Sequence, residues 1–257
     1  MRQKPDGFDH WIRFAARTDI GKKRDVNQDE VILCTDAGLF GVSDGMGGLK
    51  QGLKASEYVR AAMPKLIEIC QHEYADHRSI DCAAQDLRNT VCMMSDQLFR
   101  AGNTESQYPY GATFCGVWLL DNRAVVVNIG DSRAYVLRRY KRRLEQITED
   151  HNIAGILYRE GQLSKEEALH HPTSSQLTAF VGMNSPAQAD VFVLDVQPGD
   201  RILICSDGLY SMVDEQQLAK LMRTGNNAER ICQIMVNAAN ENGGRDNISV
   251  VYLKIEQ

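Results

Sequence analysis

The order of apolar runs in the 257-residue sequence predicts an α+β fold in which helices cover the outer faces of two packed β-sheets. Short runs typical of strands come first, and two long helical stretches follow. Further strands, two helices and one strand complete the chain. Regular alternation of strand and helix is absent, which argues against a doubly wound parallel sheet or an eight-fold barrel. We therefore expect one domain, residues 1–257.

The composition argues against several classes of protein. Its 43% hydrophobic and 25% charged residues are ordinary for a globular protein, and the net charge of −5 argues against a general nucleic-acid binder. No apolar stretch approaches the roughly 18 residues of a membrane span, and the N-terminus lacks the apolar core of a secretory signal. Seven dispersed cysteines without a C-x-x-C pair are typical of reduced thiols. We expect a cytoplasmic monomer that does not insert into membranes.

The N-terminal part is expected to begin with a loose polar leader, residues 1–10, followed by short strands. Apolar runs predict three strands, at 12–17, 30–34 and 39–43, with a polar loop at 18–29. The third run ends at a glycine-rich turn, whose bare backbone permits close approaches that a Cβ would block.

Two helical stretches are expected at 50–73 and 81–101, because apolar side chains recur there every three or four residues. The apolar positions of the first are Ala55, Tyr58, Val59, Ala62, Leu66 and Ile69. Those of the second are Ala84, Leu87, Val91, Met94 and Leu98. Met93 and Met94 are both interpreted as core residues.

The second half predicts a run of strands, two helices and a closing strand. The expected strands are 110–120, 123–129, 133–137, 144–148, 191–196, 201–205 and 247–255, and the expected helices are 214–223 and 228–240. Asp121-Asn122 is a hairpin signal. The basic sequence at 138–143 (RRYKRR) could bind anions or nucleic acid. Its short length and the negative net charge of the chain instead favour a solvated hairpin turn.

Residues 152–186 differ in kind from the rest of the second half. Short helical pieces at 153–160 and 165–169 precede a His-His-Pro sequence and several Ser and Thr residues. We interpret this segment as an inserted, mobile flap rather than part of a sheet.

Four aspartates each stand at the end of an apolar run beside a flexible residue. They are Asp44 in GVSDGMGG, Asp131 in IGDSR, Asp207 in ILICSDG and Asp246 in GGRDNIS. If the strands are neighbours, these carboxylates repel one another and shift their pKa values unless cations neutralise them. Oxygen ligands favour Mg²⁺ or Mn²⁺ over zinc, and two such ions about 3.5–4 Å apart can activate a bridging hydroxide for in-line attack on phosphorus. Taken alone, Asp44 could equally cap a following helix.

Arg24 is the candidate for binding an anion. It lies five residues before Asp29 in the polar loop, next to Lys22 and Lys23. A guanidinium group matches two phosphate oxygens, whereas the alternative is a surface salt bridge that the loop alone does not exclude.

Six motifs together closely resemble those of metal-dependent protein phosphatases of type 2C, the PPM family, and its bacterial members in particular. They are R-x-x-N-Q-D at 24–29, S-D-G-M-G-G at 43–48, G-x-T at 111–113, G-D-S-R at 130–133, S-D-G at 206–208 and G-R-D-N at 244–247. They occur in the family's order and cover nearly the whole chain. The resemblance implies a central β-sandwich of two antiparallel sheets flanked by helix pairs (α-β-β-α), with the flap inserted.

The resemblance also implies a set of metal ligands. Asp44 looks like the carboxylate that bridges two Mn²⁺ or Mg²⁺ ions, and Gly45 looks like the residue whose carbonyl binds one of them. Asp207 and Asp246 resemble the ligands of the other ion. Asp131, with Asp207, is similar to the pair that holds a third, weaker ion in bacterial members.

Other positions resemble supporting residues of the family. Asp29 resembles a carboxylate that acts on the metals through water, and Arg24 looks like the clamp on the substrate phosphate. Asn247 follows Asp246 as in the family and is expected to orient it. Further residues expected to support the site are Thr113, Gly111 and, near the third ion, Ser174.

Two positions depart from the pattern of many relatives. Met46 stands where eukaryotic members carry a His proposed as general acid, so the leaving oxygen must take its proton from metal-bound water or another group. His151 is a candidate, although a lone loop histidine is more often structural. Gln28 stands where relatives often have Glu, which predicts modest metal affinity.

The resemblance implies hydrolysis of phosphoserine and phosphothreonine in proteins, without a phosphoenzyme, opposing a bacterial serine/threonine kinase and acting on its substrates. A catalytically weak phosphoprotein-binding module of the same fold is the alternative. Such a protein would normally lack Asp44, Asp207 or Asp246, and all three are present. A nuclease is a second alternative, which the acidic net charge argues against.

Overall fold

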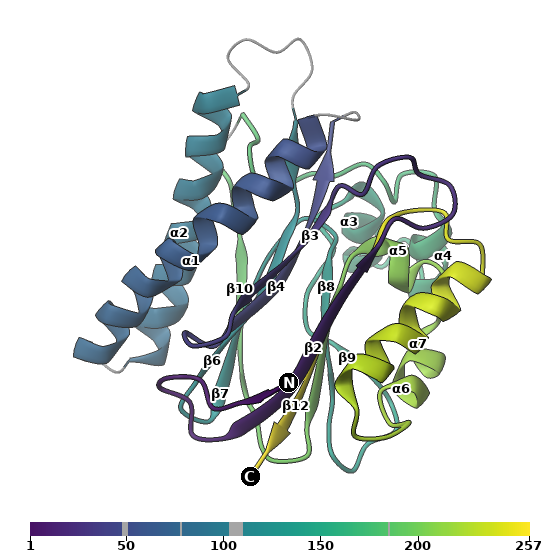
Figure 1. Cartoon of the computed structure of the whole chain (residues 1–257). Coiled ribbons are helices and arrows are strands. Elements are labelled where there is room, and N and C mark those ends of the chain that lie inside the picture. The colour runs from purple at the N-terminus through teal and green to yellow at the C-terminus, as the bar shows by residue number, and fades with distance from the viewer. Residues whose placement is uncertain (48–50, 78, 103–109, 185) are drawn as a thin grey trace.

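Two β-sheets packed face to face form the centre of the molecule, and helices cover both outer faces (Figure 1). The computed structural model describes residues 1–47, 51–77, 79–102, 110–184 and 186–257. Strand pairs in both sheets run antiparallel, as in the pairing of 11–19 with 248–256 and of 114–120 with 123–129. The expected α+β sandwich of two antiparallel sheets with outer helices is therefore confirmed.

In the described part of the chain, each sheet has six strands. Those of the first are β1 (Arg2–Gln3), β2 (Trp11–Asp19), β8 (Arg133–Leu137), β9 (Glu145–Gln146), β11 (Arg201–Cys205) and β12 (Ile248–Glu256). Those of the second are β3 (Asp29–Cys34), β4 (Leu39–Met46), β5 (Gly111–Ala112), β6 (Phe114–Leu120), β7 (Arg123–Ile129) and β10 (Asp190–Asp195). Their spatial orders are β1-β2-β12-β11-β8-β9 and β10-β7-β6-β4-β3, with β5 paired to β4.

Helices flank the sandwich on both sides (Figure 1). The long helices α1 (Gln51–His77) and α2 (Ile80–Gly102) cover the second sheet. The helices that pack on the first sheet are α5 (Asp207–Tyr210), α6 (Glu215–Leu221) and α7 (Ala228–Glu241). The helices α3 (Ile153–Arg159) and α4 (Lys165–His170) belong to the segment interpreted as a flap, whose described residues form no strand of either sheet order.

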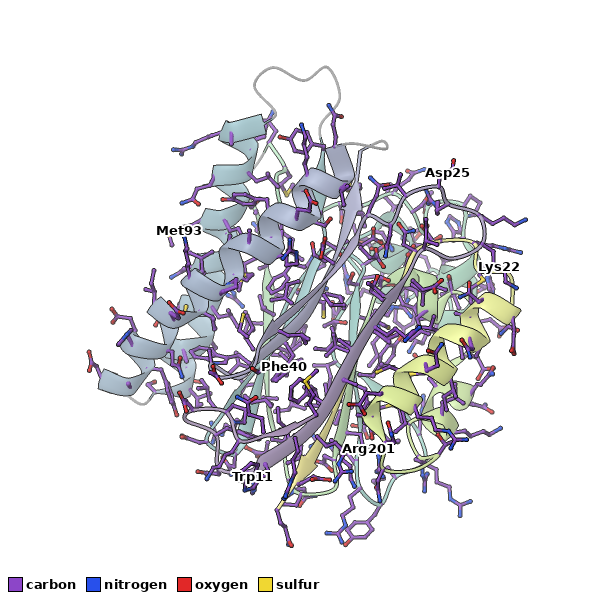
Figure 2. All side chains as sticks on the ribbon, in the orientation of Figure 1. Trp11, Lys22, Asp25, Phe40, Met93 and Arg201 are labelled. Carbon is purple, nitrogen blue, oxygen red and sulfur yellow. The ribbon has the colours of Figure 1, made fainter. Side chains whose placement is uncertain are left out.

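Three apolar layers hold these elements together. One lies between the sheets and contains Phe14, Phe40 and Val117, and Figure 2 shows Phe40 in this position. A second layer joins α1 and α2 to the second sheet, and a third joins α5, α6 and α7 to the first. Because both faces of each sheet are covered, central strands such as β6 and β8 are buried along their whole length.

The long helices bury a narrower stripe than expected. Val59, Met63 and Ile67 are fully buried at intervals of four residues, whereas Ile69 is 60% exposed. Met93 is 55% exposed, and Figure 2 shows it on the outer side of α2. The core roles predicted for Ile69 and Met93 are therefore wrong, because only a stripe that recurs every three or four residues can face one sheet.

The N-terminal segment is part of the fold and not a loose leader. β1 pairs with β2, with Arg2 opposite Arg13. Phe8 is 2% exposed and packs in the layer between the sheets. The N–H of Asp121 also donates to the carbonyl of Gly7 at 2.6 Å. The burial of Phe8 anchors this otherwise polar segment.

Two predicted turns are confirmed. Asp121 adopts a φ of 48° in the turn between β6 and β7. The basic segment 138–143 joins the antiparallel strands β8 and β9. The helix α5 was not expected, because four residues are too few to give a periodic signal. Within the described ranges, no helix has both the length and the apolar composition that a membrane span requires.

Candidate active site

The predicted acids lie where strand ends meet at one end of the sandwich. In the first sheet, the end of β11 pairs with the starts of β8 and β12. Asp207 follows β11, Asp246 precedes β12, and Asp131 lies in the segment that crosses from β7 to β8. In the second sheet, Asp44 lies near the end of β4. The antiparallel register thus brings together acids that are far apart in the sequence.

These four acids line one cavity of about 350 Å³. The positively charged guanidinium group of Arg24 belongs to a residue that lines the same cavity. The other residues that line it are Gln28, Gly45, Met46, Gly47, Thr113, Asn247 and, from the flap segment, Ser175 and Leu177. The residues predicted to bind metals and phosphate are therefore found together.

A smaller cavity of about 60 Å³ adjoins the first and shares Asp131, Asp207 and Ser175 with it. Ser174 lines this smaller cavity, which places it beside the two acids expected to hold a third ion. The sequence did not predict Ser175 and Leu177 as lining residues. In a segment rich in Ser and Thr, no periodic pattern distinguishes the side chains that line the cavity from those that face solvent.

Burial and neighbouring carboxylates raise the pKa values of Asp44, Asp131 and Asp207. The pKa of Asp44 lies well above its usual range, first because the carboxyl group is buried and then because it faces Asp29 and Asp207. Burial, followed by the charges of Asp131 and Asp246, raises the pKa of Asp207 well above its usual range too. Burial raises the pKa of Asp131 to about 7. Without cations, this cluster holds protons near neutral pH.

The donor set fits hard divalent cations. Oδ1 of Asp207 is buried and accepts no hydrogen bond from the described residues, a costly arrangement for a carboxylate without a ligand. Across the described ranges, no three His, Cys, Asp or Glu side chains are grouped tightly enough to enclose an ion by themselves. Carbonyl and water oxygens would therefore have to complete the coordination, and Mg²⁺-like ions usually retain several waters.

Asp29 lies behind Asp44 and does not line the cavity. The two acids are directly opposite each other in the β3–β4 pair. Asp29 is 3% exposed, its Oδ2 accepts a hydrogen bond from Ser206 Oγ at 2.6 Å, and burial raises its pKa to about 6. Ser206 Oγ in turn accepts the N–H of Ser249. Asp29 therefore contacts Asp44 and Ser206 from outside the cavity, and its action on metals through water stays a prediction.

Thr113 fixes the backbone on both sides of Asp44. Its Oγ1 accepts the N–H of Asp44 at 3.0 Å and forms a 2.7 Å hydrogen bond with Ser132 Oγ. Its own N–H donates to the carbonyl of Asp44 at 2.8 Å. Because Ser132 follows Asp131, Thr113 links the acid of the second sheet to the crossing segment of the first.

Asn247 holds the loop that carries Arg24. Its Oδ1 accepts the N–H of Gln28, and its Nδ2 donates to the carbonyls of Ile20 and Val26. Its effect on Asp246 comes instead from its backbone N–H, which donates to Asp246 Oδ1 at 2.8 Å. The expected orienting role therefore belongs to the backbone of Asn247, and its side chain positions the loop.

Arg24 forms an ion pair with one of the predicted metal ligands. Its Nη2 donates to Asp246 Oδ2 at 2.6 Å, and this hydrogen bond raises the pKa of Arg24. Its side chain remains 51% exposed at the cavity wall. The surface salt bridge and the phosphate clamp, which the sequence left as alternatives, are compatible at this position.

Two glycines of the motifs allow close backbone contacts. A Cβ on Gly45 would lie 2.2 Å from the carbonyl oxygen of Gly52, at the start of α1. A Cβ on Gly208 would lie 1.9 Å from the carbonyl oxygen of Asn247. Any larger residue would push α1 or β12 away from the acids. Gly48, the last residue of the 43–48 motif, lies outside the described residues.

His151 is not placed to donate a proton to a leaving group. It is 7% exposed and does not line either cavity. Its Nδ1 accepts the N–H of Gly130 at 3.2 Å, and its Nε2 lies 2.9 Å from Asp190 Oδ2. Both ring nitrogens are thus engaged in holding the crossing segment, as the structural interpretation of a lone histidine expects.

Sequence reasoning missed a buried ion pair beside Asp131. Arg133 is 7% exposed and makes two hydrogen bonds to Asp150, at 2.8 and 2.6 Å. Its guanidinium also lies 3.7 Å from the ring centroid of Tyr210, whose OH donates to the carbonyl of Asp131. The arginine of the G-D-S-R motif was the available signal, although its partner could not be read from spacing.

Comparison with known sequences gives consistent results. The family model described as protein phosphatase 2C matches residues 21–245. The serine/threonine phosphatase stp of Listeria monocytogenes is 30% identical over 248 residues, covering 93% of this chain and 94% of that protein. Protein phosphatase PhpP of Streptococcus pneumoniae is 28% identical over 243 residues, covering 93% and 96%.

Solved structures agree in fold over the whole chain. Serine/threonine phosphatase Stp1 from Staphylococcus aureus superposes with a TM-score of 0.85 at 27% identity, covering 100% of this chain and 99% of that one. The catalytic domain of the phosphatase PstP, solved in complex with two manganese ions, gives a TM-score of 0.76 at 28% identity, covering 96% and 99%.

Proposed function

The chain belongs to the protein phosphatase 2C family, and from this premise we propose that it removes phosphate from proteins by direct attack of water at a site with two divalent cations. It is a metal-dependent serine/threonine phosphatase whose substrates are phosphoproteins. The observation that carries the proposed mechanism is the convergence of four aspartates from both sheets on one cavity beside Arg24.

The acids and one carbonyl would hold the cations. Asp44 would bridge two Mn²⁺ or Mg²⁺ ions, with the carbonyl of Gly45 on one ion and Asp207 and Asp246 on the other. Asp131 and Asp207 would hold a third, weaker ion. When bound, two such cations lower the pKa of a water so that it can attack phosphorus, and they draw charge from the phosphoryl oxygens.

Arg24 would bind the phosphate of the substrate. Its bond to Asp246 holds the guanidinium at the cavity wall, and the described residues offer no acceptor to its other N–H groups. A bidentate contact from these groups would orient the phosphate and stabilise the charge that develops on its oxygens.

No side chain that lines the cavity is an obvious proton donor to the leaving oxygen. Met46 carries no acidic proton, and His151 is engaged with Gly130 and Asp190. We therefore assign this proton to water in the cavity. The flap residues Ser175 and Leu177 line the cavity and would contact the seryl or threonyl side of the substrate.

We further propose the context in which the enzyme acts. Residues 1–257 would form one monomeric catalytic domain, with 152–186 as the flap. A phosphatase of this specificity requires a kinase that supplies phosphoserine and phosphothreonine, so its partners would be a serine/threonine kinase and the substrates of that kinase.

The test is phosphate release from a phosphothreonine peptide, with Mn²⁺ or Mg²⁺, with a chelator, and with Asp207→Asn. We expect release that depends on metal and is lost in the variant. Asp195→Asn, at an exposed acid distant from the cavity, is the matched control and should retain activity. No release from the metal-loaded wild type across several phosphopeptides would overturn the catalytic proposal and favour a phosphoprotein-binding module.

A further inference from the structure

The strand β9 lies at one edge of the first sheet. It pairs with β8 on one side, through Tyr135 with Gln146 and Val136 with Glu145, and it ends the spatial order of the sheet. No other strand in the described part of the chain covers its outer side. An edge of this kind offers unpaired backbone groups to an extended chain.

The hydrogen bonds identify which backbone groups point outward. The N–H of Ile147 donates to the carbonyl of Ala134 at 2.8 Å, so residue 147 faces β8. In an antiparallel pair, successive residues alternate between facing the partner and facing away. The N–H and carbonyl of Gln146 therefore point to the outer side of β9.

A groove lies against this outer side. It has a volume of about 500 Å³, and residues 143–150 form one wall of it. The opposite wall comes from the flap helices and the start of α6, with Tyr158, Arg159, Lys165 and Glu215. Only Glu145 and Gln146 of this wall form a strand, so a peptide that pairs with β9 would do so over about two residues.

The groove adjoins the small cavity of the active site. Arg133, Asp150 and Ala168 line both the groove and the small cavity that contains Asp131 and Asp207. The buried Arg133–Asp150 pair is thus a partition with the acids on one side and the edge of β9 on the other.

Most charges that line the groove are already paired with each other. Arg159 lies 3.4 Å from Glu149, and Lys165 forms an ion pair with Glu215. With these charges neutralised, side chains of the groove select weakly for charge in a ligand. Recognition there would depend on main-chain hydrogen bonds and on the exposed face of Tyr158, which is 46% exposed.

We propose that the groove binds an extended segment of the phosphoprotein substrate, which adds as a strand to the outer edge of β9 while its phosphorylated residue enters the cavity. This inference rests on the proposed phosphatase function and specifies how that function selects protein over small phosphate esters. Main-chain pairing supplies affinity in such complexes and tolerates varied sequences. The occupant is a peptide segment because the groove combines a strand edge with a position next to the site that removes phosphate.

The central test compares Gln146→Pro with Gln146→Ala. Both variants lose the same side chain, but only proline removes the outward N–H, and an edge strand tolerates proline where the N–H faces away from the sheet. The readout is kcat/KM for a phosphothreonine peptide with about ten flanking residues on each side, divided by kcat/KM for one with about two. We expect Gln146→Pro to lower this ratio at least about fivefold relative to Gln146→Ala, the equivalent of one main-chain hydrogen bond.

Tyr158→Ala supplies a second test in case proline unfolds the strand. Tyr140→Ala is its matched control, because Tyr140 is 79% exposed in the turn before the groove and does not line it. We expect Tyr158→Ala to lower the ratio several-fold and Tyr140→Ala to leave it at the wild-type value.

Binding without turnover separates this proposal from the proposed function. Fluorescence anisotropy of the labelled long peptide in chelator should show weaker binding to Gln146→Pro than to Gln146→Ala, whether or not the protein is active. Equal binding, or a wild type that does not prefer the long peptide, would overturn the groove proposal even if p-nitrophenyl phosphate is hydrolysed with Mn²⁺. Absence of that hydrolysis would instead count against the proposed function.

Discussion

The cavity lined by the four acids and the groove beside β9 lie on either side of the small cavity that contains Asp131 and Asp207, but they differ in how their charges are balanced. In the cavity, Asp44, Asp131 and Asp207 face one another, and burial with mutual repulsion raises their pKa values. In the groove, Arg159 and Lys165 each pair with a glutamate. The cavity thus concentrates carboxyl groups that need protons or bound cations to balance their charge, whereas the groove is close to neutral by itself.

This difference indicates what each site recognises. Buried like charges persist in a fold when a ligand of opposite charge compensates them in the working state. A neutral groove beside an unpaired strand edge does not require a charged ligand, and it recognises the shape and the main chain of its ligand. The predictions below test whether the cavity is built around repulsion that cations relieve.

The largest expected effect is that of Asp207→Asn on both activity and stability. With Mn²⁺, kcat should fall about a thousandfold, because a metal ligand is lost. In chelator, the melting temperature should rise by a few degrees, because a neutral amide replaces a buried carboxyl whose ionisation is opposed by its surroundings. A lower melting temperature of Asp207→Asn in chelator would contradict repulsion among the buried carboxylates. Asp195→Asn is the control for loss of an exposed acid.

Replacement of Arg24 tests whether it clamps phosphate or merely balances Asp246. If it binds phosphate, Arg24→Ala should lower kcat/KM about a hundredfold, and Arg24→Lys should recover only part of this because an ammonium cannot bind two oxygens as a fork does. Steady-state kinetics at saturating Mn²⁺ would measure this. If KM is unchanged and Mn²⁺ binds more tightly to Arg24→Ala, Arg24 is a counterion of Asp246 and the clamp assignment is wrong.

Thr113→Val should have a smaller effect, mostly on stability. The substitution leaves the N–H of Asp44 and the hydroxyl of Ser132 without their shared partner, which should cost about 1–3 kcal/mol of unfolding free energy. Urea unfolding in chelator measures the loss. Thr90→Val is the control, a buried threonine whose hydroxyl meets only Cys70 Sγ, and an equal loss there would show that Thr113 has no special role.

The smallest effect is expected for Asp190→Asn. The hydrogen bond to His151 lowers the pKa of Asp190, so this carboxylate stabilises the fold above its unfolded pKa and loses that contribution as the pH falls through its folded value. Because the group is half-exposed, the loss at pH 7 should be below about 1 kcal/mol. The pH profile of kcat should not change, and a shifted profile would restore His151 as a proton donor.

The sequence was sufficient to predict the acids but not their surroundings. Asp44, Asp131, Asp207 and Asp246 could be found because each follows or precedes an apolar strand beside a glycine or serine, and antiparallel pairing then brings strand ends together. The partners of these acids come from other elements. Nothing in the spacing of Thr113 shows that its hydroxyl joins Asp44 to the crossing segment.

Dependence on contacts between distant elements also explains the errors in the predicted fold. The two long helices and the strands after β1 have apolar patterns, and their existence was correctly predicted, whereas β1 was not expected. Ile69 and Met93 satisfied the apolar pattern, yet which apolar side chains face the sheet depends on how the helices pack. Phe8 in a polar segment and the four-residue helix α5 gave no periodic signal, and only tertiary contacts define them.

The most direct measurement of the central claim is calorimetric titration of Mn²⁺ into the metal-free protein, in buffers of different ionisation enthalpy. The account predicts that two ions bind and displace protons, because burial raises the pKa of Asp131 to about 7 and that of Asp44 and Asp207 well above the usual range. Proton release should be larger at pH 6 than at pH 8 and should fall in Asp207→Asn. Mn²⁺ binding without proton release, or binding unaffected by Asp207→Asn, would contradict the account.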